Sequence, residues 1–591
     1  MEMGGQVGRG RPLFVLLIIM KEFLPTLRSN KTGVLVFLAP LAAAGWYLGD
    51  RPGGEIFVNR GAFYFMAFIF SAWVLALAPA LKKAFDTGSP IREYGAGLLF
   101  ALAVAASVFI SVKPEFRVLA DEANLLGVSR SMVYERRADI VTMSKNYYHN
   151  AHPVARESEK RPHMYPFFTS LVHAVSGYRP ANAFAVNFIL LAALLGSVFV
   201  FFRGLYGQLP AYAAVLITAS QPLLALTASS GGMEFMYAAF MFFSFLALRR
   251  FLREPSGGSF ATLWFTLAVM ANVRYEGPAV MAAVGLALLL SGRLKREQLA
   301  SWPFLLTPLM LLPAFCQRFC MAINYQNPSG VPAFSPAHLW PNFLSFLRVN
   351  LDFSSFYPYS PAIAIIGAVS ALLILALVFR DGGPEVRERR TVFYASLAGF
   401  MAYGLITFSY HAGVPLEQAS ARLFIPFILS LSLTAAALLC RIAARKPAAG
   451  PVILSLAAAL FITHVPTAAE NRYMNLLILT RQHKHEAAFL ERLGEKNMLV
   501  VSDRPRLFTV RGYGAVNFWY ARNNSGELLE GLERKLYPGI VVMQEVLYST
   551  GKPTAETDPG PAYSLTPLYE VQNTADSYIR VAEARPVRSK K

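Results

Sequence analysis

Two adjacent carboxylates stand in a polar segment that follows an apolar run of the sequence. Asp121 and Glu122 come shortly after the apolar run 95–112. A carboxylate beside a membrane helix can act as a general base with a partner that positions it, and paired carboxylates can also hold a divalent cation. A solvated or helix-capping acidic pair explains the same two residues when they are considered alone.

The same polar segment ends in a basic and aromatic motif at residues 160–166, which reads Lys-Arg-Pro-His-Met-Tyr-Pro. Lys160 and Arg161 place two cations close to Tyr165 at the start of a long apolar stretch. Cations beside an aromatic ring at the lipid–water boundary suit a phosphate carried on a lipid. Interfacial anchoring of the chain gives the same pattern, so both interpretations stay open.

Further charged residues stand where other apolar runs begin. Glu234 lies in the short bend Ser-Ser-Gly-Gly-Met-Glu-Phe, where an acid is a candidate functional residue, although helix N-termini also favour acids. Arg422 precedes the apolar run 423–441 and could hold an anionic head group or extend its charge to water. Arg274 and Glu276 occupy another bend and could simply pair with each other.

Few other patterns point to chemistry. His149 and His152 could share a metal, but no third ligand follows at a clear spacing, and we assign no metal site. The sequence lacks a phosphate-binding GxxxxGK[ST] loop, an HExxH motif and a serine nucleophile elbow, so ATP-driven transport and proteolysis have no motif support. The three cysteines lie in or at the end of apolar runs and predict no disulfide framework.

The elements that must position these residues are membrane helices. Hydrophobic residues make up 55% of the 591 residues and charged residues only 15%, below the quarter or so that is usual in soluble proteins. Many separate apolar runs are long enough to cross a bilayer, which excludes a soluble enzyme with one anchor. We predict about thirteen transmembrane helices, at 33–49, 61–81, 95–112, 183–203, 210–228, 232–250, 259–273, 277–291, 302–320, 361–379, 391–409, 423–441 and 451–466.

The charges in the loops predict how these helices are oriented in the membrane. With the N-terminus in the cytoplasm, all six even-numbered loops are basic, as the positive-inside rule requires, and this topology explains the net charge of +19 better than nucleic-acid binding does. The long polar loops 113–181 and 321–360 then lie outside. The basic residues of the inner loops are Lys82, Lys83, Arg92, Arg203, Arg249, Arg250, Arg253, Arg293, Lys295, Arg296, Arg380, Arg387, Arg389, Arg390, Arg441, Arg445 and Lys446.

Three parts of the chain follow from this topology. Residues 1–94 hold a cytoplasmic N-terminus and two additional helices, residues 95–466 form the transmembrane core, and residues 467–591 form a small periplasmic domain with a basic tail. Strand patterns at 498–501, 540–543 and 578–582 alternate with helical patterns at 485–493 and 528–532, which predicts an α/β fold for that domain.

The order of these features resembles the GT-C fold glycosyltransferases, in particular the bacterial branch related to protein O-mannosyltransferases and to the aminoarabinose transferases of lipid A. The resemblance rests on an outer Asp-Glu after a helix, a basic-Pro-x-hydrophobic-Tyr-Pro motif, an acid in the next outer bend and a late Arg-Leu-Phe-x-Pro re-entry. It covers roughly residues 95–440 well and the C-terminal part in outline. It implies a GT-C-like polytopic helical fold and transfer of a hexose or pentose from a polyprenyl-phosphate carrier, with inversion at the anomeric carbon.

The resemblance also implies roles for individual residues. Asp121 looks like the carboxylate that deprotonates the acceptor hydroxyl, Glu122 like its companion, and Glu234 like the second acid. Arg161, beside Lys160, replaces the lysine of the family motif that also contains Tyr165, and Arg422 looks like the arginine that contacts the lipid phosphate. The family's second proline is His163 here.

The expected partners are a lipid-linked sugar donor, membrane lipids and a lipid, glycan or protein acceptor, without nucleic acid. We expect the chain in the bacterial inner membrane, with no certain cofactor besides the donor and with a divalent cation as an open alternative. A transporter or flippase of a lipid-linked sugar would share the helices and basic outer residues but would not require Asp121. An assembly protein that uses the outer domain as a partner surface would tolerate changes at Asp121, Glu234 and Arg422 together.

Overall fold

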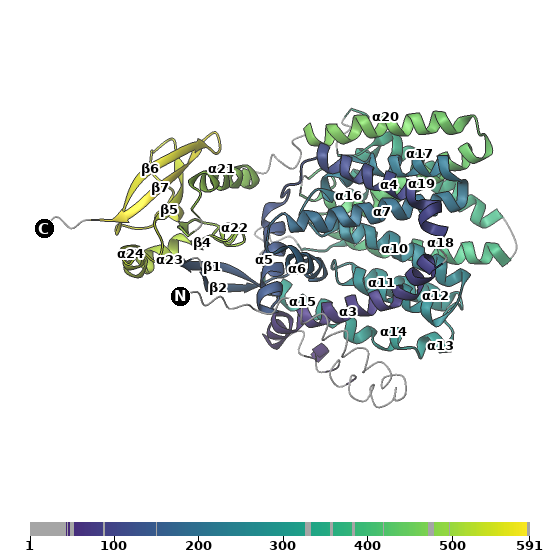
Figure 1. Ribbon diagram of the computed structural model, residues 1–591, viewed down its shortest axis with the longest axis horizontal. Helices are drawn as coiled ribbons and strands as arrows, with labels where there is room; N and C mark the ends of the chain where they lie inside the picture. Colours follow the sequence, from purple (N-terminus) through teal and green to yellow (C-terminus); the bar gives the residue numbers. More distant parts are fainter. Residues whose placement is uncertain are drawn as a thin grey trace.

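The computed structural model describes residues 39, 43, 45–47, 52–86, 89–148, 150–324, 332–354, 358–380, 384–417, 419–470, 478–495 and 497–587. Most of the helix predicted at 33–49 and residues 588–591 of the basic tail therefore lie outside the described residues. Figure 1 shows a large bundle of helices on one side and a smaller unit built around a sheet on the other, with α5 (Leu119–Glu135) and α6 (Met164–Ser176) at their junction.

The long helices of the bundle are apolar. Eight helices within the described residues are long and apolar enough to cross a membrane, which supports a polytopic membrane protein. They are α3 (Pro52–Asp86), α4 (Ser89–Ser111), α7 (Asn182–Tyr206), α10 (Glu234–Arg253), α17 (Pro361–Arg380), α18 (Pro384–Ser409), α19 (Ile425–Arg445) and α20 (Ala449–Glu470).

A bent pair of helices could form one more span. α8 (Gln208–Ala219) and α9 (Pro222–Ala228) meet at an angle of 75°. Pro222 begins α9 and has no N–H to continue the hydrogen-bond ladder of α8, which accounts for the break. The pair coincides with the single helix predicted at 210–228.

The remaining helices of the bundle are shorter. The apolar helical segments at the positions predicted as 259–273, 277–291 and 302–320 are only 10–17 residues long, at Gly257–Ala271, Gly277–Leu290 and Trp302–Gln317. Length and composition alone do not make them spans, and the predicted total of thirteen stays a prediction. These shorter helices are α11 (Gly257–Ala271), α12 (Gly277–Leu290), α13 (Arg296–Leu299), α14 (Trp302–Leu305), α15 (Thr307–Asn324) and α16 (Pro336–Leu351).

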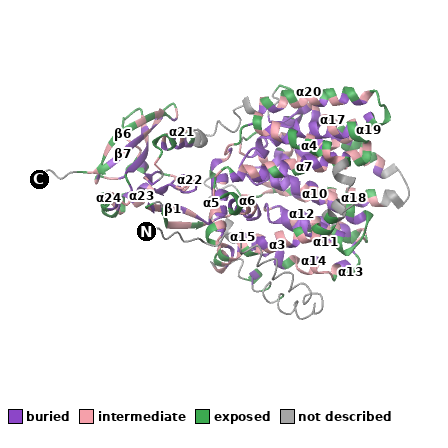
Figure 2. Ribbon diagram, viewed as in Figure 1, coloured by how far each residue is buried: buried purple, intermediate pink, exposed green. Residues whose placement is uncertain are grey.

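Large apolar side chains are exposed along the outside of the bundle. Leu372 of α17 and Ile462 of α20 are 66% and 67% exposed, and Figure 2 shows exposed positions along α20 while buried residues fill the centre of the bundle. Exposed apolar surface of this extent is unusual in soluble proteins and suits contact with lipid.

The smaller unit contains one seven-stranded sheet with the order β2-β1-β4-β3-β5-β7-β6. Strand β3 is parallel to β4 and β5, and the other neighbours are antiparallel. The strands are β1 (Asp139–Tyr147), β2 (Asn150–Ser158), β3 (Leu499–Val501), β4 (Gly514–Val516), β5 (Ile540–Leu547), β6 (Tyr563–Gln572) and β7 (Ser577–Pro586). The helices around it are α21 (Ile478–Leu493), α22 (Arg506–Thr509), α23 (Phe518–Asn523) and α24 (Ser525–Glu533).

The sheet is not confined to the C-terminal segment. Strands β1 and β2 come from the loop 113–181, and Ser144 of β1 pairs with Ala515 of β4. On the bundle side, Leu119, Ala123 and Leu126 of α5 share an apolar core with Phe508 of α22. The C-terminal unit is therefore joined to the loop that follows α4.

Candidate active site

Asp121 lies in the first turn of α5, which begins after the short segment 113–118. Its carboxylate accepts hydrogen bonds from Arg161 and from Arg422, which is 301 residues away in the sequence. Burial raises the pKa of Asp121, but the neighbouring Arg422 and Arg161 outweigh it and hold the pKa well below its usual range. Asp121 is therefore ionised at neutral pH.

Arg422 connects Asp121 to a second carboxylate. It belongs to the single 3-10 turn Ala421–Phe424, and Pro426 then stands in the first turn of α19, where a proline is tolerated. One terminal nitrogen of Arg422 bonds Asp121, and the other lies 3.3 Å from Oε1 of Glu234, the first residue of α10. The fork of the guanidinium thus bridges two acids that come from different helices.

The charged residues continue in both directions from this bridge. Glu234 also lies 3.2 Å from Arg274, which bonds Glu276 at 2.9 Å, and Arg161 bonds Glu159 at 2.6 Å. The result is an alternating chain of four carboxylates and three arginines, hereafter the charged chain, whose members in order are Glu159, Arg161, Asp121, Arg422, Glu234, Arg274 and Glu276. Each arginine is shared by two acids, which compensates charges that are mostly buried.

Lys160 lies beside this chain. Its positive charge contributes to the lowered pKa of Asp121, and its backbone carbonyl accepts a 2.9 Å hydrogen bond from Tyr275. No ion pair of its ammonium group is found within the described residues. Because the charged chain has one more acid than arginine, Lys160 is placed to balance it.

Glu122 accepts its hydrogen bonds from backbone N–H groups, whereas Asp121 accepts them from arginine side chains. Its carboxylate accepts N–H groups from Arg117 at 3.1 Å, Val118 at 3.0 Å and Gly231 at 3.0 Å, so it joins the start of α5 to the bend before α10. Burial raises the pKa of Glu122 to about 7 against the opposing effects of these N–H groups and of the positive charge of Arg422. A Cβ on Gly231 would come 2.9 Å from the ring of Phe116, which explains the glycine at this close approach.

Tyr165 and His163, which follow Arg161 in the chain, are also buried. The Tyr165 hydroxyl donates to the carbonyl of Ala183 at 2.9 Å, which ties α6 to the start of α7. Burial lowers the pKa of His163 to about 4, so its ring is neutral at neutral pH. Gln317 of α15 lies 3.4 Å from this ring and donates to the backbone carbonyls of Glu159 and Arg161.

The structure thus brings Asp121, Arg161, Glu234 and Arg422 into direct contact, with Lys160 nearby. Glu122 and Tyr165 lie next to this group, but their side chains form hydrogen bonds with backbone atoms. Sequence reasoning missed Glu159 and Gln317, which orient Arg161 and its backbone. Within the described residues, no group of three or more His, Cys, Asp or Glu side chains is placed to hold a metal ion.

Residues 160–317 match the family model described as dolichyl-phosphate-mannose-protein mannosyltransferase. The resemblance to this glycosyltransferase family is confirmed. The matched segment contains Lys160, Arg161, Tyr165 and Glu234, whereas Asp121 and Arg422 lie outside it. Together with the apolar helices, the match supports a membrane glycosyltransferase.

Two solved structures of ArnT from Cupriavidus metallidurans are also similar to this chain. The structure bound to undecaprenyl phosphate is 13% identical, with a TM-score of 0.44 over 83% of this chain and 98% of that one. The apo structure is 13% identical, with a TM-score of 0.39 over 82% of this chain and 98% of that one. No curated protein matches the sequence.

Proposed function

We propose that this protein transfers a sugar from a polyprenyl-phosphate carrier to an acceptor hydroxyl, with Asp121 as the general base and Arg161 and Arg422 as the ligands of the donor phosphate. The observation that carries the proposal is the shared contact of Asp121 with both arginines. A phosphate carries the same kind of charged oxygens as a carboxylate and suits the same guanidinium donors.

The proposed reaction follows from an exchange of partners. When the donor binds, its phosphate oxygens replace Asp121 as acceptors on Arg161 and Arg422, and the freed carboxylate receives the proton of the acceptor hydroxyl. The acceptor oxygen then forms a bond to the anomeric carbon while the bond from that carbon to the phosphate oxygen breaks. The electron pair leaves with the polyprenyl phosphate, whose charge the two arginines stabilise.

The other predicted site residues have supporting roles in this proposal. Glu234 keeps Arg422 in place by sharing it with Asp121, and Arg274 in turn holds Glu234. Lys160 adds positive charge for the donor phosphate. Glu122 fixes the start of α5, and Tyr165 fixes the start of α6 close to Arg161.

We place this site on the non-cytoplasmic side of the plasma membrane. The charged chain lies at the N-terminal ends of α10 and α19, and basic residues such as Arg253 and Arg445 stand at the opposite ends of the same helices. The positive-inside rule assigns those basic ends to the cytoplasm. Labelling of single cysteines introduced as Asn150→Cys and Glu491→Cys tests this, and reaction only from the cytoplasmic side would contradict it.

The decisive experiment is transfer of labelled sugar from a polyprenyl-phosphate donor in membrane vesicles. We expect Asp121→Asn to lower turnover about 100- to 10,000-fold, the range that loss of a general base usually produces. Glu530→Gln, an exposed carboxylate on α24, is the matched control and should transfer normally. Full turnover by Asp121→Asn at normal protein level would contradict the role of Asp121 as the general base. Movement of the lipid-linked sugar across the membrane without transfer would favour a flippase.

A further inference from the structure

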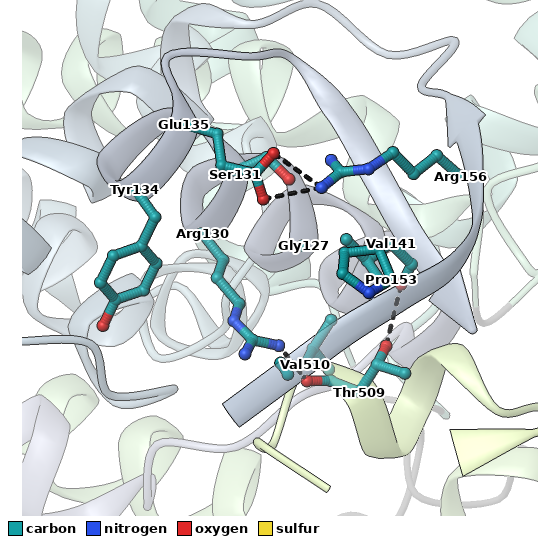
Figure 3. A pocket seen from close by; sticks show the side chains of 11 residues that line it. Gly127, Arg130, Ser131, Tyr134, Glu135, Val141, Pro153, Arg156, Thr509 and Val510 are labelled. Carbon is teal, nitrogen blue, oxygen red and sulfur yellow. Dashed lines mark hydrogen bonds and ion pairs between the residues drawn. The ribbon is translucent and has the colours of Figure 1, made fainter. Parts of the chain in front are cut away.

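A second polar site lies where the C-terminal unit meets α5. A pocket of about 400 Å³ opens between the last turns of α5, the β1–β2 hairpin and α22. Arg130, Tyr134 and Glu135 line it from α5, Arg156 from β2, and Thr509 from α22 (Figure 3). None of its lining residues belongs to the charged chain, so it is separate from the site around Asp121.

Arg130 is held in a fixed orientation at this pocket. Its Nη1 donates a 2.6 Å hydrogen bond to the carbonyl of Thr509, and its guanidinium carbon lies 5.5 Å from the centre of the Tyr178 ring. A guanidinium has five N–H donors, so further donors remain for a ligand. No carboxylate in the described part of the chain lies within ion-pair distance of Arg130.

The other charges around the pocket balance one another. Arg156 donates to both carboxylate oxygens of Glu135, at 2.6 and 2.7 Å, and its other terminal nitrogen lies 3.0 Å from Asp139. Arg137 donates to Asp139 as well, at 2.8 Å. These two arginines and two carboxylates cancel, so the charge of Arg130 is in excess and would attract an anion.

The remaining lining groups suit a sugar. Tyr134 is 66% exposed at the rim, where a face of a sugar ring can pack against its side chain. The carboxylate of Glu135, already fixed by Arg156, can accept hydrogen bonds from sugar hydroxyls, and Ser131 adds a hydroxyl to the wall. A pocket with an aromatic surface and a few oriented polar groups is typical of small-ligand sites.

We propose that this pocket binds an anionic saccharide, with its phosphate or carboxylate group on Arg130 and its ring against Tyr134. The inference rests on the proposed function, because such a saccharide would be part of the acceptor. Arg130 lies nine residues after Asp121, or about 13 Å along the helix axis and on the opposite face. An acceptor that contacts both must therefore extend over more than one sugar unit, and because residues 122–129 of α5 are buried it must pass around this helix rather than along it.

Binding of simple sugars to the purified full-length protein tests the pocket directly. Saturation-transfer NMR with glucose 6-phosphate, glucuronate, glucose and inorganic phosphate should show the two anionic sugars binding more tightly than glucose. Arg130→Ala should weaken that binding at least about tenfold, as expected for a charge-assisted hydrogen bond, and Arg130→Lys should weaken it less. Tyr134→Ala, which removes no hydrogen bond to the described residues of the C-terminal unit, should also weaken it, whereas the exposed control Arg534→Ala should not.

Three outcomes of the binding experiment would overturn the inference. Equal binding of glucose and the anionic sugars, or unchanged binding by Arg130→Ala, would show that Arg130 recognises no saccharide anion. If inorganic phosphate binds as tightly as glucose 6-phosphate and Tyr134→Ala has no effect, the pocket is a site for a free anion.

In the transfer assay, Arg130→Ala should raise KM for the acceptor more than it lowers kcat. A wild-type protein that transfers no sugar would contradict the proposed function, while the binding experiment would still decide the pocket.

Discussion

The first turn of α5 and its last turns hold charge in opposite arrangements. At the first turn, Asp121 shares two arginines within an alternating chain in which every arginine contacts two acids. At the last turns, Arg130 contacts a carbonyl and an aromatic ring, and no described carboxylate pairs with it. One helix thus carries a compensated group of charges and, about 13 Å along its axis, an uncompensated cation.

A ligand must displace an existing ion pair at Asp121 but not in the pocket at Arg130. Removing one partner of a buried ion pair leaves an unpaired charge at a cost of several kcal/mol, so a ligand at Asp121 has to replace the carboxylate with another anion. The pocket at Arg130 requires no such exchange, since Arg130 lines it and is bonded to the carbonyl of Thr509 rather than to a described carboxylate (Figure 3). We therefore assign the exchange of partners to the reacting phosphate and simple binding to the rest of the substrate.

Among the variants that test this comparison, the largest effect should come from breaking the charged chain at its central arginine. Arg422→Met leaves Asp121 and Glu234 with one arginine each and removes a proposed ligand of the donor phosphate. We expect sugar transfer to fall at least about 100-fold, as for loss of a charged donor to a reacting phosphate. The measurement is initial transfer rate in vesicles at matched protein level.

Two further variants sharpen this test. Arg422→Lys keeps the charge but not the fork that reaches two acids, so its rate should lie between those of wild type and Arg422→Met. Arg445→Met removes an arginine from the C-terminal end of α19, the helix that follows the turn of Arg422, and should leave transfer nearly unchanged. Wild-type turnover by Arg422→Met would show that the chain of ion pairs only supports the fold.

A smaller effect should appear at Glu122, the neighbour of Asp121 that contacts backbone. Its pKa is raised from 4.5 to about 7 in the folded protein. The folded state therefore holds the proton of Glu122 more tightly than the unfolded chain does. The protonated carboxyl adds to the free energy of unfolding, and this contribution is fully present below pH 4.5 and is lost as pH rises towards 7. The shift corresponds to a contribution on the order of 3 kcal/mol.

Glu122→Gln should remove this pH dependence. We expect the thermal unfolding midpoint of wild type, relative to the variant, to decrease between pH 5 and pH 7, when both are measured in the same detergent. Glu530→Gln, whose carboxylate is exposed, should follow the wild-type profile. Parallel profiles for Glu122→Gln and wild type would mean that Glu122 is ionised throughout, and that its N–H partners outweigh burial.

Much of the helical bundle could be predicted, because each long apolar run has few ways to avoid water other than a membrane helix. Asp121, Arg161, Glu234 and Arg422 could also be singled out, because their order along the chain resembles that of a known glycosyltransferase family. Their contact could not be predicted, because Asp121 and Arg422 are 301 residues apart and no local pattern encodes how helix ends meet.

The sheet and the partners of Arg161 were harder to predict from the sequence. The C-terminal strands alternate with helices, but nothing in the sequence of β1 indicates that Ser144 pairs with Ala515. Such pairing depends on how the loop is brought to the C-terminal unit rather than on local propensity. Glu159 stood beside the basic motif and could have been considered, whereas Gln317 is a single amide in an apolar run and gave no signal of its contact with the Arg161 backbone.

The smallest effect should come from the ion pair that links the C-terminal unit to the compensated end of α5. Lys484 of α21 lies 2.6 Å from Glu115, which also pairs with Arg117 just before α5. The Lys484 side chain is 45% exposed, and exposed pairs usually contribute no more than about 1 kcal/mol. Lys484→Met should therefore change transfer less than about twofold at physiological salt, and the difference should shrink at high salt because exposed charges are screened. Lys552→Met, on the turn after β5, is the matched control. A loss as large as that of Arg422→Met would contradict the comparison, since it would mean that α21 sets the position of Asp121 and that the two ends of α5 do not act separately.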